Sequence, residues 1–317
     1  MILTDSTKLF VRNGTLVWKI LPYMLISILV VCGIGIACCY PLIDELSQAG
    51  FFAQVGDIFS QTFMNFRIDE LLGAISQLTI SLFEIIAQNI ATVLPLVIIL
   101  AVIITLGGSF LINLSELAIA DCLYGYMSSN SKFSFFCCFI KNLKKSMKLQ
   151  LAKLLVVWPV DMLILAVFVA MLYLFTFDIA ILSFLTPFLI VLVLSLLVAL
   201  RQTLFCMWAP CMIVRNSTVW GALRESFVGM AKNFSVIYSR QLILTLLYIA
   251  GNIAACIFTA SVGLLLTVPA TLLFSNIMGQ VCFFYINGLR FYAGEDEIIS
   301  PKKREDWEHI NNLKDII

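Results

Sequence analysis

Charge is scarce in this chain, and histidine is almost absent. Only 12% of the 317 residues are charged, against roughly 25% in a typical soluble domain. The single histidine, His309, lies near the C-terminus, so no histidine-based site can form within the apolar segments. The sequence has no P-loop, GxGxxG or HExxH motif, and no GxSxG motif. These absences argue against an ordinary soluble domain and against the commonest enzyme classes, and we expect no cofactor.

Metal-binding and disulfide patterns are also missing. The chain has 10 cysteines, but none forms a CxxC pair or a Cys/His cluster with the spacing of zinc ligands. None falls between residues 43 and 90, which is the longest segment expected outside the cell. We therefore expect reduced cysteines and no metal site.

What the chain has in abundance is long apolar runs. Hydrophobic residues make up 61% of the sequence, and the mean hydropathy is +1.02. A transmembrane helix needs about 20 such residues. We predict six spans, at residues 18–42, 91–113, 153–177, 180–207, 241–259 and 263–286. The predicted fold is an all-α, polytopic membrane bundle of three helical hairpins, with a single domain over 1–290 and a polar cytoplasmic tail over 291–317.

The positions of the basic residues predict the orientation of these spans. Of the 20 Lys and Arg residues, 19 fall in alternate gaps between the apolar runs or, for Lys19, Lys153 and Arg201, toward the span ends that border those gaps, and the intervening gaps contain only Arg67. Basic residues near spans are retained on the cytoplasmic side. We therefore expect a multi-pass protein of the cytoplasmic (inner) cell membrane with both termini in the cytoplasm. The first run could instead be a secretory signal, because Lys8, Arg12 and Lys19 precede it; its length disfavours cleavage.

Two segments between the spans have amphipathic patterns. The outer segment 43–90 alternates apolar and acidic faces at helical spacing, which suits a cap or the lining of an outward vestibule. The inner segment 132–152 is rich in lysine, and a basic amphipathic helix at a membrane surface attracts anionic lipids. We predict that its lipid-facing basic surface comprises Lys141, Lys144, Lys145 and Lys148. Docking of a protein partner is the alternative interpretation.

Asp161 and Arg201 are the sharpest candidates for a functional site. Counted from Lys153 and Trp208, they lie about 12 Å and about 10 Å inside the third and fourth spans. An antiparallel hairpin brings them to matching depth. A lone charge in the bilayer costs roughly 2.5–3.5 kcal/mol on insertion scales, so we predict that they pair. The pair could belong to a solute or ion path, or it could be a structural clamp.

Other polar residues have weaker interpretations. Glu116 and Asp121, after the second span, could meet Arg215 and Arg224, but we expect them to be solvated at the interface. A cation–Asn phrase precedes the first, third and fifth spans, at Asn13, Asn142 and Asn233. The phrase is consistent with three repeated hairpins or with a basic anchor before each inward-starting helix.

One loop resembles a known family. The run Trp208-Ala209-Pro210-Cys211-Met212-Ile213-Val214, followed by the segment 219–227 (Val-Trp-Gly-Ala-Leu-Arg-Glu-Ser-Phe), is similar to bacterial six-span proteins. These include the membrane domain attached to some glycerophosphoryl diester phosphodiesterases. The resemblance implies a bacterial membrane protein. It does not carry over phosphodiesterase activity, because the chain has no counterpart of the soluble catalytic domain.

Together these patterns favour a non-enzymatic inner-membrane protein. We expect it to support envelope or lipid homeostasis, or to serve as the membrane subunit of a larger assembly. The alternative is a transporter or permease with a midplane polar site at Asp161 and Arg201. We expect membrane lipids as partners, with a protein partner or a second copy left open, and no nucleic acid.

Overall fold

The computed structural model describes residues 2–38, 40–48, 50–57, 95, 98–100, 102–173, 180–259, 262–294 and 297–301. The chain divides into two compact units. One contains Met1–Met24 together with Asn113–Ile317, and the other contains Leu25–Ile112. The candidate sites lie in the first unit.

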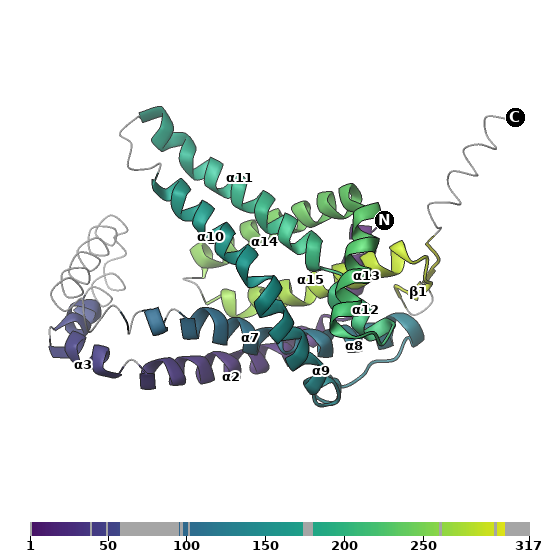
Figure 1. Ribbon diagram of the computed structural model, residues 1–317, viewed down its shortest axis with the longest axis horizontal. Helices are drawn as coiled ribbons and strands as arrows, with labels where there is room; N and C mark the ends of the chain where they lie inside the picture. The colour runs from purple at the N-terminus through teal and green to yellow at the C-terminus, as the bar shows by residue number, and fades with distance from the viewer. Residues whose placement is uncertain are drawn as a thin grey trace, which may run out of the picture. The chain divides into compact units, whose positions relative to one another are not determined.

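The protein is all-α, and 85% of it is helical, which confirms the predicted class (Figure 1). The principal helices are α1 (Ile2–Arg12), α2 (Thr15–Cys38), α3 (Tyr40–Gln48), α7 (Gly108–Asn113), α8 (Glu116–Ser129), α9 (Phe135–Val156), α10 (Trp158–Tyr173), α11 (Ala180–Phe205), α12 (Trp208–Val214), α13 (Val219–Lys232), α14 (Phe234–Phe258) and α15 (Leu264–Ile286). A π-helical segment, Ile103–Gly107, precedes α7. Two short strands, β1 (Phe291–Tyr292) and β2 (Ile298–Ile299), pair antiparallel.

Several helices are long and apolar enough to cross a membrane. Among the described residues, five qualify alone, and the number is six if a bent pair of helices is counted as one span. The observed bounds of α11 and α15 agree closely with the predicted spans 180–207 and 263–286. The structure thus supports a multi-pass membrane protein. Most of the outer segment 43–90, for which an amphipathic pattern is predicted, lies outside the described residues, as does most of the tail.

The bent pair consists of α9 and α10, which meet at Val157 with an angle of 44°. Pro159 explains the bend, because it has no N–H to donate to the carbonyl of Leu155 and its ring crowds that carbonyl. The chain resumes its helical bonding at once, with Asp161 N donating to Val157 O at 3.0 Å. The basic segment before the third span is therefore a helix that leads directly into it.

Within the first unit, α10 and α11 run side by side, and α11 also packs against α14 (Figure 1). These helices present apolar side chains outward: Leu163 on α10, Leu192 on α11 and Leu247 on α14 are more than half exposed. A soluble protein would bury such continuous apolar surface. The outward-facing aliphatic residues are what a surface in contact with lipid requires.

The buried core of this unit lies where α8, α12 and α15 meet. Trp208 is fully buried, and its indole Nε1 donates to Val219 O at 2.9 Å. On α15, Gly279 permits an unusually close approach to the chain after α11. A Cβ atom built at Gly279 would lie 2.3 Å from the carbonyl oxygen of Cys206.

Gly279→Ala should therefore destabilise the protein, although alanine is normally the better helix former. Because the added methyl meets backbone rather than a mobile side chain, we expect a loss of about 1–3 kcal/mol. Gly251→Ala on α14 is the matched control, since nothing lies within 4 Å of its Cβ position. Thermal unfolding of both variants in detergent tests this, and equal melting temperatures would contradict it.

The N-terminal helix α1 is attached to the C-terminal part of the unit by three polar contacts. The hydroxyl of Tyr285 donates to Asp5 Oδ2 at 2.5 Å, and Ser6 Oγ contacts Met278 Sδ at 3.4 Å. Lys8 Nζ donates to Glu297 Oε1 at 2.5 Å, and this bond raises the pKa of Lys8 above its usual value. The first part of the predicted tail therefore contains the strand pair of β1 and β2, and the contact between Lys8 and Glu297 attaches it to α1.

Candidate functional site

The structure brings Asp161 and Arg201 together. Arg201 Nε and Nη2 donate to the two carboxylate oxygens of Asp161 at 2.5 and 2.9 Å. This bidentate arrangement is the strongest geometry available to an Arg–carboxylate pair. It ties α10 to α11, which pack against each other.

The pair lies near the ends of its two helices. Asp161 is the fourth residue of α10, about 5 Å from its start, and Arg201 is about 6 Å from the end of α11 at Phe205. The sequence-based depths were larger because they were counted from Lys153 and Trp208, beyond the helix ends. The side chains remain 36% and 35% exposed. The pair is therefore accessible, and it lies next to the bend at Val157.

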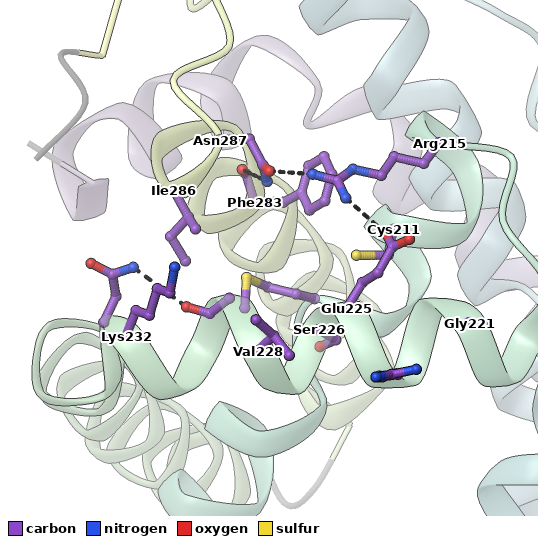
Figure 2. Close-up of a pocket in the computed structure, with 14 residues that line it drawn as sticks. Cys211, Arg215, Gly221, Glu225, Ser226, Val228, Lys232, Phe283, Ile286 and Asn287 are labelled. Carbon is purple, nitrogen blue, oxygen red and sulfur yellow. Dashed lines mark hydrogen bonds and ion pairs between the residues drawn. The ribbon is translucent and has the colours of Figure 1, made fainter. Parts of the chain in front are cut away.

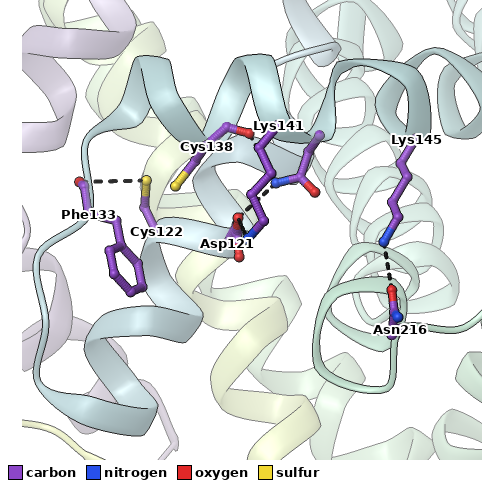
Figure 3. A network of polar contacts seen from close by, with 8 residues as sticks. Asp121, Cys122, Phe133, Cys138, Lys141, Lys145 and Asn216 are labelled. Carbon is purple, nitrogen blue, oxygen red and sulfur yellow. Dashed lines mark hydrogen bonds and ion pairs between the residues drawn. The ribbon is translucent and has the colours of Figure 1, made fainter.

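The predicted basic surface on α9 separates into two kinds of lysine. Lys141 Nζ contacts Asp121 Oδ2 at 2.9 Å, and Lys145 Nζ donates to Asn216 Oδ1 at 2.6 Å (Figure 3). Lys144 and Lys148 are exposed, and neither has a side-chain partner within the described part of the chain. Only these last two lysines are uncommitted to the protein.

An apolar stripe runs along α9 beside the uncommitted lysines. Its members recur every three or four residues and are all at least one-third exposed: Phe136, Ile140, Leu143, Met147, Leu151 and Leu155. The most exposed, Ile140 and Leu155, are 74% and 72% accessible. A helix with an exposed apolar stripe next to lysines has the form of a helix that lies in a membrane interface. We call this stripe, with Lys144 and Lys148, the α9 surface.

The side of α9 that faces α8 is held by buried polar groups. Asp121 accepts a hydrogen bond from Asn142 Nδ2 at 2.8 Å as well as the contact with Lys141. Glu116 forms an ion pair with Lys153 and accepts a bond from Gln150 Nε2 at 3.2 Å. The Glu116 and Lys153 side chains are only 14% and 18% exposed.

The expectation that Glu116 and Asp121 are solvated, or meet Arg215 and Arg224, is therefore wrong. Both acids bind cations on α9, which follows α8 after a short connection. Arg215 instead pairs with Glu225. The missed signal is that α9 carries Lys141 and Lys153 on the face whose other residues, Asn142 and Gln150, are buried.

The three cation–Asn phrases share one local feature. The side-chain amides of Asn13, Asn142 and Asn233 each donate to the carbonyl four residues earlier, at 3.0, 3.0 and 3.4 Å. Asn13 and Asn233 each stand at the break between two helices, whereas Asn142 lies within α9. The phrase thus marks the change from an amphipathic helix to a span in two of the three cases.

No group of three or more His, Cys, Asp and Glu side chains is arranged to hold a metal ion within the described segments. The arginine and lysine side chains described above can bind anions or neutralise negative charge.

The chain matches no protein-family model, no curated protein and no solved structure. The resemblance of the loop at 208–227 to the phosphodiesterase-linked membrane domains remains a prediction.

Proposed function

We propose that the chain is a non-enzymatic membrane protein that binds anionic lipids through the α9 surface and thereby serves lipid or envelope homeostasis. It has six spans in three in–out–in hairpins, with both termini and α9 on the cytoplasmic side of a bacterial inner membrane. It acts alone or as the membrane subunit of a larger assembly. The observation that carries this proposal is the exposed apolar stripe of α9 beside two lysines that have no side-chain partner among the described residues.

The fixed rotation of α9 distinguishes it from a helix that merely leads into a span. If its lysines served only to fix the orientation of the protein, all four could point into water without order. Instead, Lys141 and Lys145 bind Asp121 and Asn216, which fixes how α9 is rotated. This rotation leaves Lys144 and Lys148 beside the exposed residues Leu143 and Met147. Cations beside a membrane-embedded stripe lie at the depth of lipid phosphates.

Replacing Lys144 and Lys148 by glutamine should weaken the binding of anionic lipid. Each cation near an anionic surface contributes about 1 kcal/mol, so the double variant should bind phosphatidylglycerol about thirtyfold more weakly. The measurement is native mass spectrometry of the full chain released from nanodiscs that contain phosphatidylglycerol and phosphatidylcholine.

The matched control is Lys132→Gln with Arg290→Gln, which removes two exposed cations outside the α9 surface. Equal loss of phosphatidylglycerol in the two double variants would overturn the proposal. Loss confined to the α9 variant, with an unchanged melting temperature, would support it.

A transporter or permease is the second candidate function, and the accessibility of the Asp161–Arg201 pair favours it. Both of these side chains are about one-third exposed, so a solute that reaches this depth would meet the pair. Solute flux into proteoliposomes that is abolished by Asp161→Asn and by Arg201→Gln would support this candidate. Flux that survives both substitutions would exclude the pair as part of a path.

A further inference from the structure

A large basic pocket lies between α13 and the C-terminal end of α15 (Figure 2). Its volume is about 1110 Å³, which is slightly above the range of about 300–1,000 Å³ for small-molecule sites. The floor is provided by α12 and the residues just before it, including Met207 and Cys211. It shares no residue with the α9 surface.

One face of α13 forms a wall of the pocket. Gly221, Arg224, Glu225, Val228, Gly229 and Lys232 all line it, and they recur at the three- and four-residue intervals that place side chains on one side of a helix. Glycine at 221 and 229 leaves room between the charged residues. A Cβ atom at Gly229 would meet only Ile286 and Met207, at 3.7 Å. The pocket is therefore shaped by small residues alternating with charged ones.

The charge of the lining is positive. Arg215, Arg224 and Lys232 line the pocket against one acid, Glu225, which gives a formal excess of two positive charges. Arg215 Nη1 donates to Glu225 Oε2 at 3.0 Å, and its Nη2 donates to Asn287 Oδ1 at 2.6 Å. These bonds, with a guanidinium-to-ring distance of 5.8 Å to Phe283, fix Arg215 in place. Glu225 is therefore satisfied by Arg215.

Two further polar groups of the lining are left without partners. Within the described segments, the guanidinium of Arg224 has no hydrogen-bond or ion-pair partner. Ser226 is 1% exposed, and its hydroxyl has no hydrogen-bond partner among the described residues. A buried hydroxyl without a partner costs about 1–3 kcal/mol. The guanidinium of Arg224 and the hydroxyl of Ser226 line the same pocket, so a polar ligand bound there would supply partners for both.

We propose that this pocket binds the phosphate group of an anionic ligand, with Arg224 and Lys232 as the principal contacts and Arg215 as a fixed third cation. Phosphate suits the site because guanidinium binds it in a bidentate manner, and because a phosphate group can balance the excess positive charge. The apolar part of the lining, Met207, Phe283 and Ile286, accommodates an alkyl portion. The phosphate is presented either by a lipid head group or by a soluble phosphate compound.

The test uses the full chain carrying Lys144→Gln and Lys148→Gln, so that lipid binding at the α9 surface is already removed. In one arm, inorganic phosphate is titrated into protein held in phosphatidylcholine nanodiscs, and binding is followed by calorimetry. In the other arm, nanodiscs contain phosphatidylglycerol, and the retained lipid is counted by native mass spectrometry. Binding in the first arm identifies a soluble phosphate compound, and binding only in the second identifies a lipid head group.

Arg224→Gln should weaken binding about tenfold or more in whichever arm is positive, because it removes a charge-assisted hydrogen-bond donor pair. Arg224→Lys should weaken binding less than Arg224→Gln does, since lysine keeps the positive charge but cannot bind phosphate in a bidentate manner. Arg290→Gln is the matched control and should leave binding unchanged, because Arg290 does not line the pocket. No binding in either arm, or equal effects of Arg224→Gln and Arg290→Gln, would overturn the proposal. Unchanged phosphatidylglycerol binding at the α9 surface in the Lys144→Gln, Lys148→Gln variant, with phosphate binding at the pocket retained, would refute only the proposed function.

Discussion

Glu116→Ala is expected to lower the unfolding free energy by about 3–5 kcal/mol, the range observed when one partner is removed from a buried ion pair. Glu116 lies at the start of α8 and binds Lys153 and Gln150 on α9. Without it, Lys153, whose side chain is only 18% exposed, keeps an unpaired ammonium group, and the buried amide of Gln150 loses one acceptor. Unfolding in increasing concentrations of SDS, followed by tryptophan fluorescence in bicelles, measures the loss.

Two comparisons distinguish the effect of leaving a buried charge unpaired from the effect of removing a side chain. The double variant Glu116→Leu with Lys153→Met should be close to wild type in stability, because no charge is left without a partner. Glu225→Ala removes a more exposed acid, whose pair with Arg215 has side chains 39% and 47% accessible. It should cost about 1 kcal/mol or less. If Glu116→Ala and Glu225→Ala prove equal, the α8–α9 ion pair contributes no more than a surface contact.

Separating Asp161 from Arg201 is expected to have the next largest effect. Asp161→Asn leaves a guanidinium without its carboxylate on α11, and Arg201→Gln leaves the carboxylate alone on α10. Insertion scales assign roughly 2.5–3.5 kcal/mol to a lone charge at the centre of a span. Because the pair lies near the helix ends, we expect a loss of about 2 kcal/mol for each single variant. The yield of folded monomer on size-exclusion chromatography and the SDS midpoint both report it.

The charge swap tests whether the two residues act as a pair. Asp161→Arg with Arg201→Asp should recover at least half of the stability lost in the single variants, since opposite charges again face each other. A swap that is less stable than both single variants would show that the local surroundings of each residue matter more than the pairing. Thr203→Val, on the same turn of α11 but bonded only to Ala199 O, controls for general sensitivity of this helix.

The all-α class and the contact between Asp161 and Arg201 could be read from the sequence for one physical reason. Apolar runs long enough to cross a membrane must be helical to satisfy their backbone, and a helical hairpin fixes which depths meet. Asp161 and Arg201 are rare charges in two adjacent runs, so pairing is the simplest way to satisfy both. Their distance from the helix ends could not be derived, because the bend at Pro159 ends one helix and starts another.

The partners of Glu116 and Asp121 could not be predicted because they depend on the rotation of α8 and α9 about their axes. The sequence contains enough cations near the membrane surface to satisfy either acid in several ways. Only the packing of α8 against α9 selects Lys141 and Lys153 over Arg215 and Arg224. The same limit applies to the α9 surface: four lysines with similar spacing differ only in whether Asp121 or Asn216 lies within reach.

For the pocket between α13 and α15, one wall could be predicted from the sequence and the opposing wall could not. The spacing of Gly221, Arg224, Val228, Gly229 and Lys232 indicates one helical face with charges separated by gaps. The opposing wall comes from Phe283 and Ile286 on α15, more than 50 residues later in the chain. No local pattern in the sequence connects these two segments.

The attachment of α1 to the C-terminal part of the chain has a consequence for biosynthesis. Asp5 and Tyr285 are 280 positions apart, and ribosomes add about 5–20 residues per second. Helix α1 therefore leaves the ribosome roughly 15 to 60 s before its binding site exists. During that interval the face of α1 that carries Leu9 is uncovered, so the newly made helix needs the membrane surface or a chaperone to shield it. Truncation before Tyr285 would leave α1 without a docked position.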